Sequence, residues 1–198
     1  MKVYIDFDRT LFDCDSFLGD LYNVIKKYKI PKKIFKDSQI QCKKMGFNPY
    51  IILEKVEKHC SFNHEIYNDI DKLLDNTSSY LYADALSFLK NLKKSGYEII
   101  ILTKGNLYYQ KRKIINANIS KYCDDIIITM SHKGNLNIDY MNSVFIDDNP
   151  VEIKNILRKK PKELIRIKRN DSKYYDISLN RDIKTVNSLQ EIIDNKLL

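Results

Sequence analysis

The sequence has little of what small secreted proteins and membrane proteins depend on. Its four cysteines lie far apart and form no C-x-x-C pair, which is typical of reduced thiols. They are Cys14, Cys42, Cys60 and Cys123. No apolar run approaches the roughly 20 residues of a membrane-spanning helix. Asp6 and Asp8 interrupt the apolar start of the chain, so it does not resemble a signal peptide. We therefore expect a cytoplasmic protein with no membrane segment.

Alanine is also scarce, whereas lysine, isoleucine, asparagine and tyrosine are abundant, a composition that an AT-rich genome produces. The abundance of lysine contributes to the formal net charge of +8 and to the isoelectric point of about 9.1. Such a charge suits a polyanionic partner such as nucleic acid. However, the positive residues are spread along the chain, with no motif of interleaved basic and aromatic residues. We favour the compositional explanation, although a positive field still attracts a phosphorylated substrate.

Apolar runs that favour strands alternate with amphipathic segments that favour helices. A strand is expected at residues 2–7, and a regular rhythm begins after residue 80. The expected strands there are 97–103, 125–129, 143–147 and 163–167, and the expected helices are 82–95, 107–117, 151–159 and 187–196. In the first of these helices, Ala85, Leu86, Leu89 and Leu92 are predicted to share the buried face. Continuous apolar strands alternating with helices predict an α/β fold, a Rossmann-like parallel sheet covered by helices on both faces.

Residues 14–79 differ in character from the rest of the chain. They contain no strong strand pattern, and four helical patterns are expected at 16–29, 31–44, 49–60 and 63–75. A polar turn cluster ends the segment at 75–79. We therefore predict an all-α insertion at 14–79 within an α/β core formed by 1–13 and 80–198.

Polar residues follow three of the predicted strands, and in parallel sheets ligands bind at those carboxyl ends. Asp6 and Asp8 follow the first strand. As residues i and i+2 of an extended segment they would lie side by side and repel each other unless a cation or proton intervenes. The other strand ends supply Thr103, followed by Lys104, Gly105 and Asn106, and the pair Asp147 and Asp148.

In these residues the chain resembles the haloacid dehalogenase-like superfamily, whose members are mostly phosphatases. The family's first motif, D-x-D-x-T, matches Asp6, Asp8 and Thr10. Its second motif matches Thr103, and its fourth, a pair of carboxylates after an apolar strand, matches Asp147 and Asp148. The third motif is a single basic residue, for which Lys133 is the candidate and Lys104 the competitor. The helical insertion at 14–79 corresponds to the family's type 1 cap.

The resemblance implies a magnesium-dependent phosphomonoester hydrolase that acts on a small phosphorylated metabolite. Asp6 would be the nucleophile that forms an aspartyl-phosphate, and Asp8 the general acid and base. Asp6, Asp148 and the backbone carbonyl of Asp8 would bind Mg²⁺, and Asp147 would bind it either directly or through a water molecule. Thr103 and Lys133 would stabilise the transferred phosphoryl group. Thr10, Arg9, Lys104, Gly105 and Asn106 are the further candidates for binding phosphate.

The chain departs from the family pattern in two places. Arg9 stands where many members have glycine, and its side chain either adds positive charge beside the phosphate or points away. Only 13 residues lie between the 126–129 strand and Ser143, so we expect a loop or a single turn around Lys133. Asp13 and Asp15 follow the first motif, where they either cap the first inserted helix or face the substrate.

Several alternatives remain beside the phosphatase hypothesis. One is a phosphotransferase of the same family, such as a sugar phosphomutase, in which attack by water is suppressed. Another is a basic nucleic-acid-binding module or a phosphatase of nucleic-acid ends, although a binding module has no use for the carboxylates. Dehalogenation is disfavoured, because that branch does not need the metal-binding carboxylates. A zinc site at His59 and His64 is disfavoured because too few ligands are nearby.

Overall fold

A six-stranded parallel sheet forms the centre of the computed structural model, which describes residues 1–170, 172–179 and 183–198. The strand order is β3-β2-β1-β4-β5-β6, and each neighbouring pair is parallel. The strands are β1 (Lys2–Ile5), β2 (Glu98–Lys104), β3 (Asp125–Thr129), β4 (Ser143–Asp147), β5 (Glu163–Ile167) and β6 (Lys184–Val186). This arrangement confirms the predicted α/β class and places β1 and β4 side by side.

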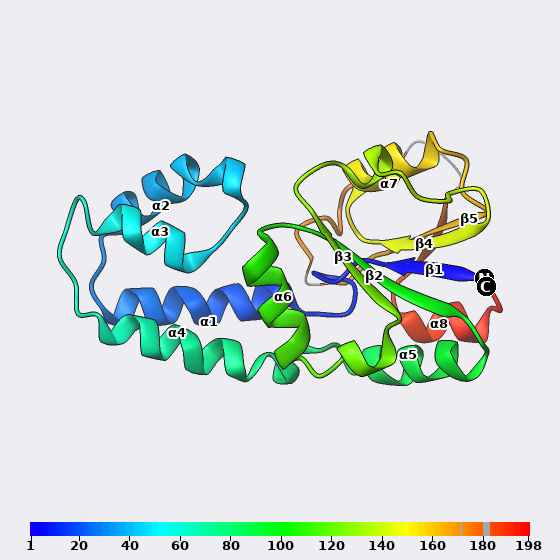
Figure 1. Cartoon of the computed structure of the whole chain (residues 1–198), viewed down its shortest axis with the longest axis horizontal. Coiled ribbons are helices and arrows are strands. Elements are labelled where there is room, and N and C mark those ends of the chain that lie inside the picture. The colour runs from blue at the N-terminus through cyan, green and yellow to red at the C-terminus, as the bar shows by residue number, and fades with distance from the viewer. Residues whose placement is uncertain (171, 180–182) are drawn as a thin grey trace.

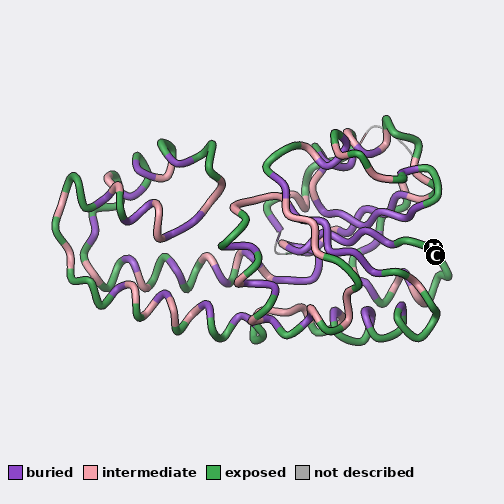
Figure 2. The backbone as a smooth tube through the Cα atoms, viewed as in Figure 1, coloured by how far each residue is buried: buried purple, intermediate pink, exposed green. Residues whose placement is uncertain are grey.

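Helices pack against both faces of the sheet, as the continuous apolar strands predict (Figure 1). Val3 and Ile5 of β1 contribute to one hydrophobic cluster, whereas Tyr4 belongs to a second cluster on the opposite face. The first face is covered by α5 (Ala85–Lys94), α6 (Leu107–Asn116) and α8 (Leu189–Asp194), and the second by α7 (Pro150–Leu157). Figure 2 shows the strands as the most continuously buried part of the backbone.

The segment between β1 and α5 is helical, as predicted, and extends away from the sheet (Figure 1). Its elements are α1 (Cys14–Lys27), α2 (Lys32–Gln41), η1 (Lys43–Met45), α3 (Pro49–Val56), α4 (Glu65–Asp75) and η2 (Thr77–Tyr80). Helices α1 and α4 run side by side, and α2 packs on α3. Their buried residues, including Phe17, Leu21 and Ile70, join the hydrophobic cluster on the α5 face of the sheet.

Four features differ from the sequence predictions or complete them. Strand β6 was not predicted, because Lys184 and Thr185 are exposed and only Val186 is buried. The helix expected over 31–44 ends at Gln41 and continues as the separate 3-10 turn η1. Leu86 was wrongly placed on the buried face of α5, since it is 38% exposed. Between β3 and β4 the expected short turn is confirmed as η4 (Lys133–Asn135).

Helix ends follow simple local chemistry. Asp13 caps α1, with its carboxylate accepting from the Ser16 amide at 2.9 Å, and Asn48 caps α3, in which Pro49 occupies the first turn.

Among the helices of the described residues, none is long and apolar enough to cross a membrane.

Candidate active site

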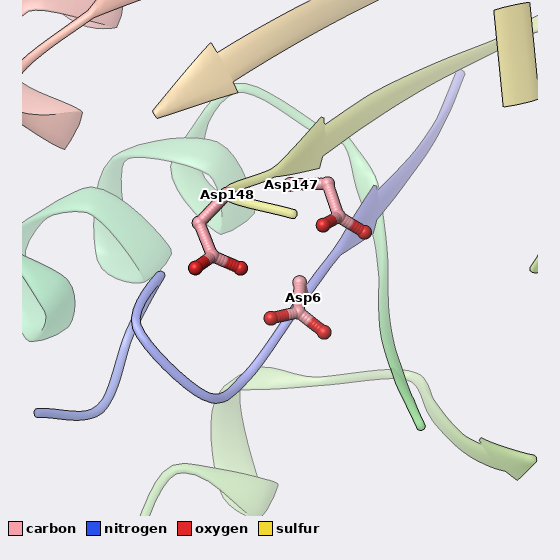
Figure 3. A group of neighbouring side chains, drawn as sticks. All are labelled: Asp6, Asp147 and Asp148. Atoms are coloured by element: carbon pink, nitrogen blue, oxygen red, sulfur yellow. The ribbon is translucent and has the colours of Figure 1, made fainter. Parts of the chain in front are cut away.

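Three buried carboxylates meet at the carboxyl ends of β1 and β4 (Figure 3). Asp6 directly follows β1, Asp147 is the last residue of β4, and Asp148 comes next. Since the two strands are parallel neighbours, their ends bring the side chains together. One oxygen from each of the three carboxylates lies within 4.8 Å of the others. This three-carboxylate cluster is 2–7% exposed.

Lys133 is the basic residue that contacts the cluster. Its Nζ donates to Asp6 Oδ1 at 2.5 Å and to Asp147 Oδ2 at 2.6 Å. The backbone around it is also anchored, because the Lys133 amide donates to Glu152 Oε2 at 2.8 Å and its carbonyl accepts from the Tyr140 hydroxyl at 2.5 Å. When all these groups are ionised, one ammonium against three carboxylates leaves two negative charges uncompensated.

The electrostatics of the cluster fit a divalent cation. Burial raises the pKa of Asp6 to about 7, with Asp147 adding to the shift and Lys133 opposing it. Burial, together with the charges of Asp6 and Asp147, raises the pKa of Asp148 well above its ordinary value. The side chain of Asp148 has one weak partner among the described residues, the Ser172 hydroxyl at 3.5 Å. A buried carboxylate with so little compensation is costly. Its hard oxygen donors, with those of Asp6 and Asp147, fit Mg²⁺.

The Asp8 side chain lies outside this cluster and is held by helix α6. Its Oδ1 accepts from Lys113 Nζ at 2.6 Å, and its Oδ2 accepts from Gln110 Nε2 at 2.7 Å. Burial acts to raise the pKa of Asp8, but the charge and hydrogen bond of Lys113 and the hydrogen bond of Gln110 outweigh it, so this pKa falls below its ordinary value. Asp6 and Asp8 therefore occupy different environments, although only one residue separates them.

The two threonines expected at the phosphate site are both fully buried. Thr103 Oγ1 accepts from Gln110 Nε2 at 3.3 Å, which leaves the hydroxyl hydrogen available to a ligand. The Thr10 hydroxyl has no hydrogen-bond partner within the described ranges, whereas its carbonyl accepts from Arg169 at 2.8 Å.

Lys104 and Gly105 are not arranged as expected. The Lys104 ammonium lies 3.2 Å from Glu152 Oε1 and 3.3 Å from His132 Nδ1, so it points to α7 and not to the three-carboxylate cluster. Of the two competing lysines, the structure brings Lys133 to the carboxylates. The Gly105 amide donates to the Thr129 carbonyl at 2.9 Å. In this structure the Gly105 amide therefore already has a partner within the protein.

Asn106 connects the end of β2 to the inserted helices. Its side chain caps α6 by accepting from the Tyr109 amide at 3.2 Å. The same side chain donates to the Met45 carbonyl at 3.0 Å and accepts from Asn48 Nδ2 at 3.2 Å. Gly46 lies against this contact, and a Cβ atom there would come within 2.5 Å of the backbone nitrogen of Asn106. Asn106 thus holds the 45–48 segment beside the site.

Arg9 adopts a left-handed backbone conformation with φ 62°, which explains why glycine is common at this position of the motif. Its guanidinium binds Asp15 in a bidentate pair at 2.7 and 2.6 Å and lies 5.9 Å from the centre of the Tyr174 ring. Of the two acidic residues after the motif, Asp13 is the helix cap and Asp15 is the partner of Arg9.

Sequence reasoning missed Gln110, Lys113 and Glu152. All three are helical and buried, at 4%, 2% and 2% exposure. Gln110 and Lys113 share the spacing of two buried residues, Ile114 of α6 and Ala117 at the cap of that helix. The signal that could have identified them is a polar residue at a buried position of a helix.

Comparison with known proteins agrees with this geometry. A family model described as haloacid dehalogenase-like hydrolase matches residues 3–154, which include all three residues of the three-carboxylate cluster. No curated protein gives a significant match to the sequence.

Solved structures share the fold at low sequence identity. A haloacid dehalogenase-like hydrolase from Burkholderia xenovorans is 17% identical, with a TM-score of 0.77 over 97% of this chain and 94% of that one. A HAD-hydrolase from Bacillus subtilis, bound to magnesium, is 12% identical, with a TM-score of 0.66 over 100% and 98%. The L-2-haloacid dehalogenase from Xanthobacter autotrophicus, with chloropropionic acid covalently bound, is 13% identical, with a TM-score of 0.64 over 96% of each chain.

Since the family model covers most of the sequence, the chain belongs to the haloacid dehalogenase-like hydrolases.

Proposed function

We propose that this protein is a magnesium-dependent phosphomonoester hydrolase that acts on a small phosphorylated metabolite. The observation that carries the proposal is the three-carboxylate cluster with its single lysine. The two uncompensated charges match a divalent cation, and Asp6, Asp148 and Asp147 would hold it. Bound there, Mg²⁺ would neutralise charge on the phosphoryl oxygens and on the carboxylates.

In the first half of the reaction, an oxygen of Asp6 attacks phosphorus and the bond to the leaving oxygen breaks. Asp6 Oδ1 is engaged by Lys133, whereas Oδ2 accepts no hydrogen bond from the described residues, which makes Oδ2 the attacking atom. For this step Asp8 must first take up a proton, because Lys113 and Gln110 keep it ionised in the substrate-free structure, and it then donates this proton to the departing oxygen. The products are an alcohol and an aspartyl-phosphate on Asp6.

In the second half, Asp8 removes a proton from water, and the oxygen of that water attacks the same phosphorus. The bond between phosphorus and Asp6 breaks, which regenerates the Asp6 carboxylate and releases inorganic phosphate. Lys133 and the Thr103 hydroxyl stabilise the negative charge that shifts onto the phosphoryl oxygens, because both are buried and fixed before the reaction begins.

The inserted helices would act as a cap that limits substrate size. Residues 14–79 form this cap in the proposal, and the contact of Asn106 with Met45 and Asn48 is where it meets the β2 loop. A closed cap excludes water and bulky substrates from the site. Arg9, fixed by Asp15 at the base of α1, adds positive charge on this side.

The experiment is a phosphate-release assay with p-nitrophenyl phosphate and a panel of phosphorylated metabolites, with and without Mg²⁺. The wild-type protein is expected to release phosphate only with the divalent ion, and Asp6→Asn is expected to lose all turnover. Asp37→Asn, a change at an exposed position of α2, is the matched control and should behave as wild type. Full activity in excess chelator, or native activity of Asp6→Asn, would refute the proposal.

Two further assays separate the remaining members of the family. A phosphotransferase would isomerise or transfer phosphate between metabolites with little free phosphate released. A dehalogenase would release chloride from 2-chloropropionate and would not respond to Mg²⁺. The cluster disfavours dehalogenation, since that reaction does not need a divalent cation and two carboxylates of the cluster would then have no role. It suits a hydrolase and a phosphotransferase equally.

A further inference from the structure

We propose that a cavity between α1 and α2 of the cap holds the far end of the substrate. The substrate is then an elongated phosphomonoester that carries an apolar ring and a second anionic group. This inference rests on the proposed function, because it places the reacting phosphoryl group at the three-carboxylate cluster. It assigns a role to a part of the cap that does not contact the cluster.

The cavity has the size and the walls of a small-molecule site. Its volume is about 610 Å³, within the range typical of ligand pockets. The ring of Tyr22 on α1 packs edge-on against Phe35 on α2, with 5.8 Å between the ring centres. Tyr22 is 42% exposed, whereas Phe35, Ile25 and Ile30 form a buried apolar wall. This surface favours a flat apolar group.

Three lysines line the same cavity, Lys26 on α1 and Lys32 and Lys36 on α2. None of the three forms an ion pair within the part of the chain that the structure describes. The adjacent Lys27, in contrast, points to α4 and is paired with Asp69 at 2.7 Å. Unpaired positive charges around an apolar cavity favour a ligand that carries an anionic group beside its ring.

One stripe of α1 leads from the candidate active site to this cavity. The stripe follows the spacing of a single helix face and consists of Asp15, Gly19, Tyr22 and Lys26. It faces α2, while α4 lies on the opposite side of α1 (Figure 1). At its start Asp15 binds Arg9. With a rise of 1.5 Å per residue, Tyr22 lies about 10 Å and Lys26 about 16 Å beyond Asp15 along the helix axis. Only an elongated substrate spans this distance.

Gly19 keeps the stripe open between its two ends. It stands in the interior of α1, where glycine weakens a helix relative to alanine. Packing does not require it, because beyond its own helix no heavy atom of the described residues lies within 4 Å of the position that a Cβ atom would take. The free space over the helix at this point gives a substrate a path from Asp15 to Tyr22.

The test uses four aryl phosphates that share one reacting end. They are phenyl phosphate, biphenyl-4-yl phosphate, and two forms of the latter with a carboxylate or a carboxamide on the outer ring. Their phenols are similar leaving groups, because the added groups are remote from the reacting oxygen. With Mg²⁺ present, kcat/KM should rise about 10-fold from phenyl to biphenyl phosphate, since burial of one ring typically contributes that factor or more. It should rise again with the carboxylate and not with the carboxamide.

Gly19→Leu tests the path along α1. Leucine favours the helix and has free space at this position, so the variant is expected to fold. It should remove most of the preference for biphenyl phosphate over phenyl phosphate, and Gly19→Ala should remove less. A loss that is equal for both substrates would show a general defect and would count against the inference.

The double variant Lys26→Met/Lys36→Met tests the charge of the cavity. It should lower the ratio of kcat/KM for the carboxylate to that for the carboxamide to about 1. Lys33→Met is the matched control, because Lys33 is exposed on α2 and does not line the cavity. It should keep the wild-type ratios for all four substrates.

The inference fails if the wild-type protein hydrolyses phenyl phosphate with Mg²⁺ but does not prefer the longer substrates. It also fails if the Gly19 and lysine variants keep the wild-type preferences. A wild-type protein that hydrolyses none of the four phosphates, nor p-nitrophenyl phosphate, would instead overturn the proposed function and this inference with it.

Discussion

Asp148 is the residue whose environment most needs a partner. It is 3% exposed, close to two other carboxylates, and bound among the described residues only by a long contact to Ser172. Its neighbour Lys133 is already occupied by Asp6 and Asp147. In the metal-free protein, Asp148 is therefore expected to destabilise the fold at neutral pH.

Asp148→Asn should therefore stabilise the metal-free protein by about 1–3 kcal/mol at pH 7. The pKa of Asp148 is raised in the folded state, mainly by burial and then by Asp6 and Asp147. Hence the penalty is present above the ordinary carboxyl pKa and disappears below it. Urea denaturation with chelator present, at pH 7 and near pH 3.5, measures the difference. An equally large gain at both pH values would contradict this account.

Arg9 offers a test of backbone strain. Arg9→Gly and Arg9→Ala both lose the pair with Asp15, but only glycine is unstrained at φ 62°. Left-handed backbone costs an L-residue about 1–2 kcal/mol, and glycine loses about 0.5–1 kcal/mol more entropy on folding. Arg9→Gly should therefore be the more stable variant by about 0.5–1 kcal/mol in chemical denaturation. Equal stabilities would show that the backbone relaxes at this turn.

At the residue scale, the sequence predicted which residue types lie at the site but not where each side chain points. The spacing of Asp6, Asp147 and Asp148 after apolar strands was enough to predict that they meet, because parallel strand ends share an edge. The sequence could not decide whether Lys104 or Lys133 contacts the carboxylates. A strand end fixes where a side chain begins, but not which partner it reaches. The position of Gln110 could not be predicted, because the sequence does not show which face of α6 meets the loop after β2.

At the scale of elements, α1 and α4 are joined by an ionic contact near the outer end of the pair. Asp69 of α4 accepts from Lys27 at 2.7 Å and from the Tyr28 hydroxyl at 2.8 Å, and Lys72 adds a weaker bond at 3.3 Å. These hydrogen bonds, that of Lys27 first, lower the pKa of Asp69 to about 2. The contact ties the end of α1 to the middle of α4.

Asp69→Asn should destabilise the protein at pH 7, and this effect should vanish in acid. Because the folded pKa is lowered, the stabilisation is present above the ordinary carboxyl pKa near 3.8 and is lost as pH falls toward about 2. Thermal unfolding of both proteins from pH 7 to pH 2 checks this. A constant difference across that range would show that Asp69 acts by packing and not by charge.

Elements were predicted well where they are long and apolar. Strand β4 is buried throughout, and its apolar run was unmistakable. Strand β6 was missed because three residues with one buried side chain produce no pattern, and it forms only because β5 offers an edge to pair with. The break after α2 was missed because Gly46, the one residue nearby that favours a helix end, follows the 3-10 turn η1 and not α2.

The whole molecule should respond to the metal as a ligand of the folded state. A ligand at 100 times its Kd stabilises by about 2.7 kcal/mol, which for a chain of this size raises Tm by roughly 5–10 °C. Mg²⁺ is expected to produce such a shift in the wild-type protein and a much smaller one in Asp148→Asn. Calorimetry with and without chelator is the measurement, and an identical rise in both proteins would place the ion elsewhere.

One hydrophobic cluster runs without interruption from the sheet into the inserted helices, from Val3 and Ile101 through Phe12 and Phe17 to Ile52. The insertion is therefore not a detachable module. Exchanging residues 14–79 for the corresponding segment of another protein would replace only one side of a shared interior, and such a chimaera would need compensating changes around Phe12. Substitutions on the exposed faces of α1 to α4 leave this shared interior intact, so the fold should tolerate them better than a replacement of the whole segment.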